Sequence, residues 1–255
     1  MAPVPPEQIL RNLGITDPAD IDLEAIAWHL GAKIRYRPLD GCEARIVGNV
    51  DRAIITVNSR SIPRRQRFSI AHELGHWMYH RGQKLPCETD GVGAGAVGPL
   101  SPERVADRFA GGLIMPAFLL DKVAKGYAKA NFQTVRSIAE TFNASVTATA
   151  IRLVEGDHMP AVLISHGTKG RKWFTRARSV PERWFPADDL SPDSFAFDIL
   201  FGGKSDDPIP RKVGADAWFD RWGADRFEVH EQSIKTAADE ILSLILISDE
   251  RMLAD

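Results

Sequence analysis

The amino-acid sequence predicts an α+β protein of two domains. The first observation is a set of three short extended runs between residues 32 and 58, followed at once by a helical pattern. The second is a wholly helical stretch from residue 117 to residue 156. The third is a change after residue 157, where extended runs rich in aromatic residues begin. We therefore expect a first domain at 1–157, with a small antiparallel or mixed sheet and a helical bundle, and a smaller α+β domain at 158–255.

Composition limits the possible functions. With 255 residues, of which 44% are hydrophobic, the chain can build two cores. The net charge of −2 gives no electrostatic preference for nucleic acid or an anionic membrane, so we expect neither direct DNA binding nor membrane binding. The first seven residues lack the basic and apolar regions of a signal peptide, and the longest apolar run is too short to span a bilayer. With only two cysteines, these features predict a cytoplasmic protein.

The first domain begins with a helix and three strands. Asp20 or Asp22 can cap a helix that ends at Gly31, and its apolar face is formed by Leu23, Ile26, Ala27 and Leu30. Extended runs follow at 32–37, 43–48 and 53–58, separated by segments with turn-forming residues. These runs are the expected sheet of the first domain.

The third run comes immediately before the next helix, and we expect it to lie at an edge of the sheet. An exposed edge can pair with an extended peptide through main-chain hydrogen bonds. A fully paired central strand fits the sequence equally well. The residues that would form this docking edge are Ile54, Ile55, Thr56 and Val57.

The helix after the third run carries the most informative motif, His72-Glu73-Leu74-Gly75-His76. Ser61 can cap this helix and Pro63 lies in its first turn, while Gly82 can end it. Positions i and i+4 share one helix face, so His72 and His76 can both reach a single Zn²⁺. Glu73 then lies beside the metal, where it can take a proton from water and return it to a leaving amine. Gly75, inside the helix, indicates the close approach of another backbone.

A catalytic zinc site needs a third protein ligand, and we choose Glu103. The segment 101–110 reads as a capped helix start on which Glu103 and Asp107 are one turn apart. Glu103 can complete a set of two histidines and one glutamate, while Asp107 can accept the second N–H of a ligating imidazole. The alternative is that both acids are solvated and paired with arginines of the same helix.

These motifs resemble the ImmA/IrrE metallo-endopeptidases. The resemblance covers roughly residues 20 to 155 and includes both the 70–76 and the 103–110 segments, followed by Leu113-Ile114-Met115-Pro116. It implies a zincin-like catalytic domain of the gluzincin type, with His72, His76 and Glu103 as zinc ligands and Glu73 as the catalytic base. It also implies a substrate: a helix-turn-helix transcriptional repressor, cleaved to release gene expression in a stress response or a mobile element. A ligand set of imidazole nitrogens and a carboxylate can also bind Mn²⁺, so Mn²⁺ is the alternative metal at this site.

Three further features near the motif have less defined roles. His80 lies about 12 Å along the helix from His72, which is too far for the two residues to bind one metal. His80 and Tyr79 are instead candidates for contacting a metal ligand or for stabilising the oxyanion of the reaction. Cys87 lies between the two motif segments and can serve as an inhibitory zinc ligand or as an ordinary thiol. The segment 91–98, rich in Gly and Ala, resembles an inserted loop.

Residues 133–155 have the outline of a helix-turn-helix. This outline supports an alternative function, a DNA- or protein-binding transcriptional regulator with a non-catalytic metal site. A DNA-binding protein needs a row of basic residues and side chains that reach the edges of the bases. The only side chains of the second helix suited to such contacts are Thr147, Thr149 and Arg152. We therefore favour a helix pair that packs against the catalytic domain.

The second domain contains four of the six Trp and seven of the twelve Phe residues. Strands are expected at 161–165, 172–176, 227–233 and 241–248, and most of the aromatic side chains should belong to the core. No residue there has metal-ligand spacing. We therefore expect this domain to have a sensor or regulatory role, or simply to cover an apolar face of the first domain.

Overall fold

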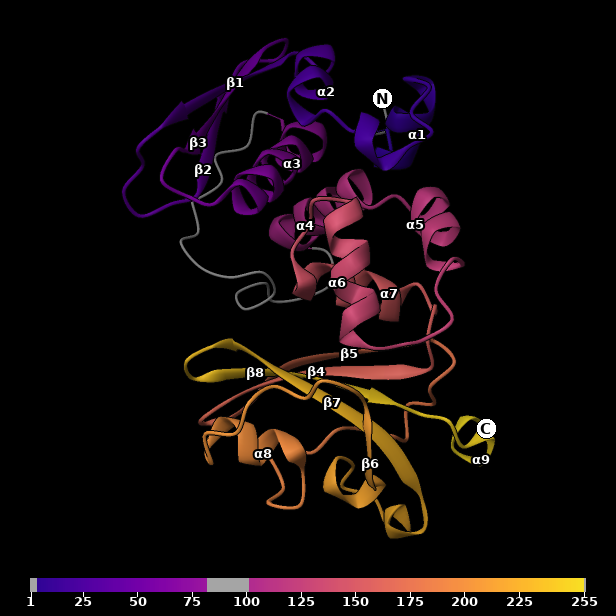
Figure 1. Cartoon of the computed structure of the whole chain (residues 1–255). Helices are drawn as coiled ribbons and strands as arrows, with labels where there is room; N and C mark the ends of the chain where they lie inside the picture. The colour runs from indigo at the N-terminus through magenta and orange to yellow at the C-terminus, as the bar shows by residue number, and fades with distance from the viewer. Residues whose placement is uncertain (1–3, 82–100, 255) are drawn as a thin grey trace. The chain divides into compact units, whose positions relative to one another are not determined.

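The computed structural model describes residues 4–81 and 101–254, and the chain folds into two compact units (Figure 1). The first unit comprises residues 1–123 and 139–145, and the second comprises 124–138 and 146–255. Both helices and strands are present, as expected for an α+β protein. Gly82, Cys87 and the segment 91–98 lie outside the described residues. Among those that are described, no helix is long and apolar enough to cross a membrane.

The first unit contains a three-stranded mixed sheet. Its strands are β1 (Ala32–Arg37), β2 (Ala44–Gly48) and β3 (Ala53–Asn58), in the spatial order β1-β3-β2. β1 runs parallel to β3, and β2 runs antiparallel to it. All three expected strands are confirmed within one residue of their predicted bounds.

The expected position of the third strand is wrong. β3 is the central strand, paired on both sides, so Ile54, Ile55, Thr56 and Val57 do not form an edge. Burial explains the arrangement, because alternate residues of β3 (Ala53, Ile55 and Val57) are buried, and a central strand shields both of its ladders from water. Of the three strands, β1 and β2 lie at the edges.

The helices of the first unit are α1 (Pro6–Asn12), α2 (Leu23–His29), α3 (Pro63–Tyr79), α4 (Pro102–Ile114) and α5 (Ala117–Ala124), with a short 3₁₀ helix at Pro18–Asp20. Asp22 caps α2 by accepting hydrogen bonds from two backbone N–H groups, and Gly31 follows with a φ of 84°. The expected cap of α3 is wrong. Ser61 donates its hydroxyl hydrogen to Glu43 instead, and α3 begins at Pro63, whose missing N–H needs no partner there.

α3 and α4 pack against each other at very short range. A Cβ atom added to Gly75 on α3 would lie 2.8 Å from the Cα atom of Ala106 on α4. This confirms the close backbone approach that Gly75 predicts. α3 also packs against β2 and β3, so the motif helix is held between the sheet and α4 (Figure 1).

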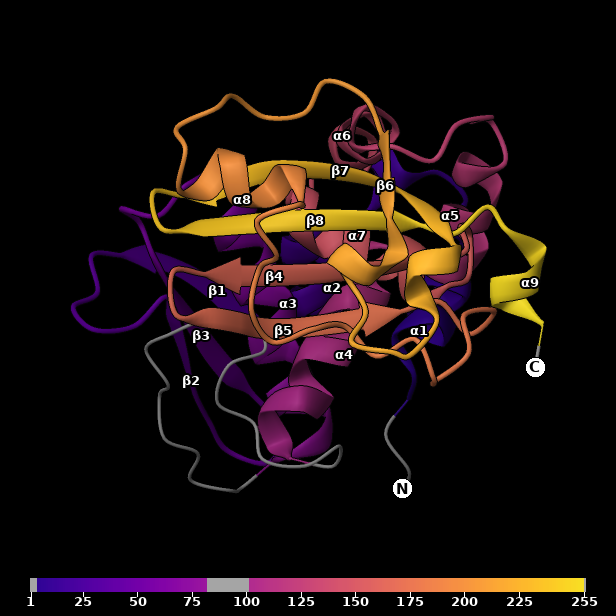
Figure 2. The same cartoon turned by 90° about the horizontal axis from the view of Figure 1, so that it is seen from below.

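The second unit is built on a five-stranded antiparallel sheet in the order β5-β4-β8-β7-β6. The strands are β4 (Ala161–Gly167), β5 (Gly170–Arg176), β6 (Arg211–Gly214), β7 (Glu228–Ala237) and β8 (Glu240–Leu246). The four expected strands are confirmed, whereas the sequence did not indicate β6. α7 (Val146–Glu155) packs against β4 and β5, and α8 (Phe195–Leu200) packs on the opposite face against β7 and β8 (Figures 1 and 2). Two 3₁₀ helices (Ala215–Ala217 and Ala224–Arg226) and α9 (Glu250–Leu253) complete the unit.

The two helices of the expected pair are present. α6 (Phe132–Thr141) and α7 are joined by a turn in which Asn143 has a φ of 49°. The first part of α6 and all of α7 belong to the second unit, and the last turn of α6 belongs to the first. The compact units therefore do not divide at residue 157, because α7 packs on the second unit's sheet. A domain that folds independently from residue 158 stays a prediction.

The expectation that most aromatic residues of the second unit are core is only partly correct. Trp184, Trp218 and Phe219 are buried, but Phe185 and Trp222 are exposed, and most of the others are half-buried. A physical reason is visible at the β5 edge of the sheet. There the Arg171 guanidinium lies over the rings of Phe174 and Phe185, which also pack edge-to-face on each other, so a charged side chain covers part of each ring.

Candidate metal centre

Three donor atoms from two helices converge on one point. His72 and His76 come from α3 and Glu103 comes from the first turn of α4. The two histidine Nε2 atoms are 3.0 Å apart, and Glu103 Oε2 lies 3.1 Å from His72 Nε2 and 3.4 Å from His76 Nε2. Ligands about 2.0 Å from a tetrahedral Zn²⁺ are about 3.3 Å from one another, so this spacing suits one small cation. The structure therefore brings together the three residues that the sequence nominates as ligands, and their role as metal ligands stays a prediction.

Asp107 supports the first of these histidines. Its Oδ1 atom lies 2.9 Å from Nδ1 of His72. When Nδ1–H donates to this carboxylate, the lone pair of Nε2 faces the point where the donors converge. Burial alone would lower the pKa of His72, but the hydrogen bond to Asp107 and the charges of Asp107, Glu73 and Glu103 outweigh it, so the pKa is raised. The alternative of two solvated acids is wrong, because both carboxylates contact His72.

His80 stands next to the second histidine. The Nδ1 atoms of His76 and His80 are 3.3 Å apart, at the end of α3. Burial, together with the positive charges that His72 and His80 can carry, lowers the pKa of His76 to about 3. His76 is therefore neutral at pH 7, which is the form that binds a metal. The Tyr79 ring packs edge-on against Phe109, and its centroid lies 6.4 Å from that of the His80 ring.

Glu73 on α3 is buried, with 8% of its surface exposed. Burial raises the pKa of Glu73 to about 7; the charge of His72 opposes this shift and that of Glu103 adds to it. A carboxyl group whose pKa lies near neutral pH can both accept and return a proton. A bound cation would shift this pKa downwards, because positive charge favours the carboxylate.

The helix pair does not offer a second functional site of the expected kind. Thr149, one of three side chains on α7 that the sequence nominates for base contacts, is fully buried, and Arg152 is half-buried. A side chain that packs against the protein cannot reach a base edge. The burial fits a packing helix pair, but the expectation that the pair packs against the catalytic domain is wrong for α7, which packs on β4 and β5 of the second unit.

Comparison with known proteins identifies a family and solved structures of related fold. Residues 27–154 match the sequence model of a peptidase family described as "IrrE N-terminal-like domain". No curated protein matches the chain. Among solved structures, a Mycobacterium tuberculosis transcriptional regulator superposes with a TM-score of 0.60 at 13% identity, over 94% of this chain and 86% of that one. At this identity the likeness concerns the fold alone.

The contact between His72 and Asp107 predicts an effect on metal affinity. Asp107→Asn keeps the size of the side chain but removes the charge that orients the imidazole. We expect Zn²⁺ affinity at pH 7 to fall about 10-fold to 100-fold, measured by competition with a chromophoric chelator. Asp20→Asn, an exposed acid in the same unit, is the control and should bind like the wild type. Equal affinity in both variants would exclude an orienting role for Asp107.

Proposed function

This chain belongs to the peptidase family with the IrrE N-terminal-like domain, and from that membership we propose that it is a zinc-dependent endopeptidase. The observation that carries the proposal is the convergence of His72, His76 and Glu103, whose donor atoms all lie within 4.8 Å of one another. Glu73 is next to the first of these ligands and is buried beside them. Two neutral imidazoles and one carboxylate are a donor set that Zn²⁺ prefers, and they leave a coordination position for substrate.

The proposed arrangement is zincin-like and of the gluzincin type. The mixed sheet supports α3, which carries the two histidines and Glu73, and α4 supplies the glutamate ligand. A bound Zn²⁺ supplies Lewis acidity, which polarises a peptide carbonyl and makes water more acidic. Glu73 accepts the proton of the attacking water and returns it to the leaving amine. Asp107 holds His72 in the tautomer that binds metal, and His80 contacts the far side of the His76 ring.

The proposed substrate is a helix-turn-helix transcriptional repressor in the cytoplasm. The peptidase family implies a protein substrate, and the resemblance to ImmA/IrrE proteins supplies the repressor class. Cleavage of a repressor would release transcription, in a stress response or from a mobile element. The buried Thr149 on α7 gives no support to the alternative, a regulator that reads DNA itself.

We further propose that the substrate backbone docks on β2, in place of the strand that the sequence suggested. Glu43 and Asn49, at the two ends of β2, exchange hydrogen bonds with the β3 side of the sheet. In an antiparallel ladder the bonded positions alternate, so the N–H and C=O groups of Ala44, Ile46 and Gly48 point away from β3. An extended peptide can pair with these groups. α3 packs against β2, which brings this edge next to the helix of the metal ligands.

Catalysis and metal binding can be separated at Glu73. Glu73→Gln keeps the size of the side chain but cannot accept a proton, so we expect it to bind one Zn²⁺ and to cleave about 10²-fold to 10⁴-fold more slowly. The assay follows, by mass spectrometry, the cleavage of purified helix-turn-helix repressors from the same genome, with Zn²⁺ present. Glu24→Gln, an exposed glutamate on α2, should cleave like the wild type. Undiminished cleavage by Glu73→Gln would remove Glu73 as the base.

The docking edge is tested at Ile46. Ile46→Pro removes an N–H that does not bond to β3, and proline is tolerated at sheet edges, so folding and zinc content should be kept. Losing one main-chain hydrogen bond to the substrate should lower kcat/KM about 5-fold to 30-fold. Ile46→Val keeps the N–H and is the matched control. If both variants cleave with the same kcat/KM, the substrate does not pair with β2.

A further inference from the structure

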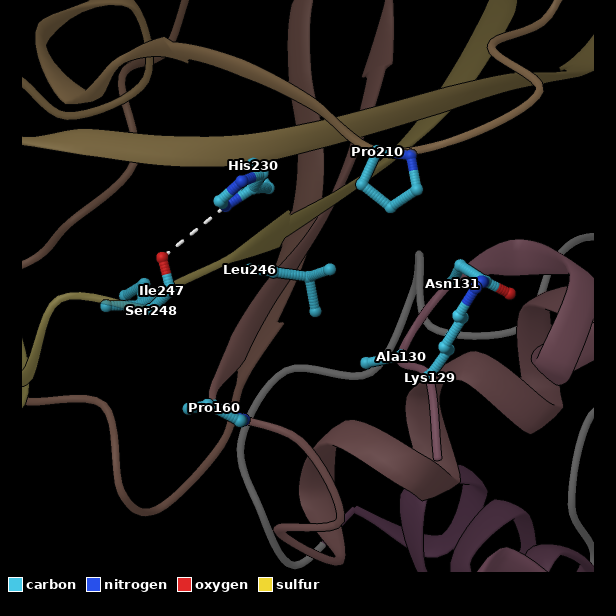
Figure 3. A pocket seen from close by; sticks show the side chains of 9 residues that line it. All are labelled: Lys129, Ala130, Asn131, Pro160, Pro210, His230, Leu246, Ile247 and Ser248. Atoms are coloured by element: carbon cyan, nitrogen blue, oxygen red, sulfur yellow. Dashed lines mark hydrogen bonds between the residues drawn. The ribbon is translucent and has the colours of Figure 1, made fainter. Parts of the chain in front are cut away.

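The second unit contains an open pocket of about 630 Å³, and none of its lining residues belongs to the metal centre (Figure 3). It is formed where the segment before α6 meets the ends of β7 and β8. Figure 3 shows the side chains arranged around Leu246, which lies in the middle of the view. The lining residues are Lys129, Ala130, Asn131, Pro160, Pro210, His230, Leu246, Ile247 and Ser248. Pockets of 300 to 1,000 Å³ are of the size that small organic ligands occupy.

The walls of the pocket combine an apolar surface with a few polar groups. Leu246, Ile247, Pro160, Pro210 and Ala130 provide the apolar surface. The lining also includes the polar residues Lys129, Asn131, His230 and Ser248, although most of the exposed lining surface is apolar. His230 Nδ1 lies 3.4 Å from Ser248 Oγ, as the dashed line in Figure 3 marks. A largely apolar lining with a few polar groups is typical of sites that bind organic molecules in one orientation.

The charge of the pocket is positive and unbalanced. No Asp or Glu is among the nine lining residues. The neighbouring cations are already neutralised, because Arg211 pairs with Asp207 and Lys212 pairs with Glu228. Within the part of the chain that the structure describes, the ammonium of Lys129 has no ion pair. An anionic group that entered the pocket would therefore find a lysine and no acid among the lining residues.

The segment that carries Lys129 is held in place by hydrogen bonds. The backbone carbonyl of Lys129 accepts a hydrogen bond from the Thr134 hydroxyl at 2.7 Å. Asn131 Oδ1 accepts one from the Thr134 N–H at 2.8 Å. The N–H of Phe132 donates to the buried side chain of Gln232 on β7 at 2.7 Å. These bonds tie the segment to the start of α6 and to the sheet, so this wall is formed before any ligand binds.

We propose that this pocket binds a small organic carboxylate, with its apolar body against Leu246 and Ile247 and its carboxylate on Lys129. The polar side chains of Asn131, His230 and Ser248 supply further hydrogen-bond donors at the rim. This binding site is separate from the proposed peptidase chemistry and does not depend on a metal. It gives the second unit, which includes residues 124–138, a specific ligand-binding role.

The test is isothermal titration calorimetry of the full-length chain with 2-naphthylacetate. The neutral control ligand is 2-naphthylacetamide, which has the same apolar body. We expect the acid to bind with a submillimolar Kd and the amide to bind about 10-fold more weakly, because a charge-assisted hydrogen bond to Lys129 is lost.

Two variants and one control complete the experiment. Lys129→Met should remove the preference for the acid, and Ala130→Phe should fill the pocket and abolish binding of both compounds. Lys125→Met, an exposed lysine in the same segment that does not line the pocket, should bind like the wild type. The thermal midpoint of each variant checks its folding. No binding of the acid at millimolar concentration, or equal binding by the wild type and Lys129→Met, would overturn the proposal.

Discussion

The close approach of α3 and α4 at Gly75 and Ala106 is the constraint on which the metal centre depends. With no side chain at Gly75, the backbone of α4 can lie directly on α3. Glu103 and Asp107, one turn apart on α4, then meet His72 from two directions, one at each ring nitrogen. A larger residue at position 75 would push α4 outwards, and overpacking of this kind typically costs about 1–3 kcal/mol.

The charges at this contact explain why a cation belongs there. Three carboxylates, those of Glu73, Glu103 and Asp107, lie around two imidazoles in a largely buried space. Without a cation, burial raises the pKa of Glu73 to about 7 and lowers the pKa of His76 to about 3, so both groups favour their neutral forms. A dication at the convergence point would stabilise the carboxylates while the histidines remain neutral ligands. Burial makes the charged carboxylates unfavourable when no cation is present. The same burial therefore favours the metal-bound form of the centre.

Local features of the chain were predictable from sequence, while non-local ones were not. The i and i+4 spacing of His72 and His76, and the one-turn spacing of Glu103 and Asp107, set which groups share a helix face, and the observed contacts follow from it. Strand order depends on pairing between distant segments. The sequence therefore could not decide whether β3 is an edge strand or the central strand. β6 was missed because it has only four residues and two of them are exposed cations. The pocket around Leu246 combines residues 129 to 248, and no periodicity indicates it.

The most direct measurement is X-ray absorption spectroscopy at the zinc edge on the full-length chain loaded with one equivalent of Zn²⁺. With His72, His76 and Glu103 as ligands, we predict a shell of nitrogen and oxygen atoms at about 2.0 Å, with the outer-shell scattering of two imidazoles and no sulfur. The His72→Ala, His76→Ala double variant should then fail to retain zinc. A sulfur shell at about 2.3 Å, from Cys42 or Cys87, or stoichiometric zinc in the double variant, would contradict the proposed centre.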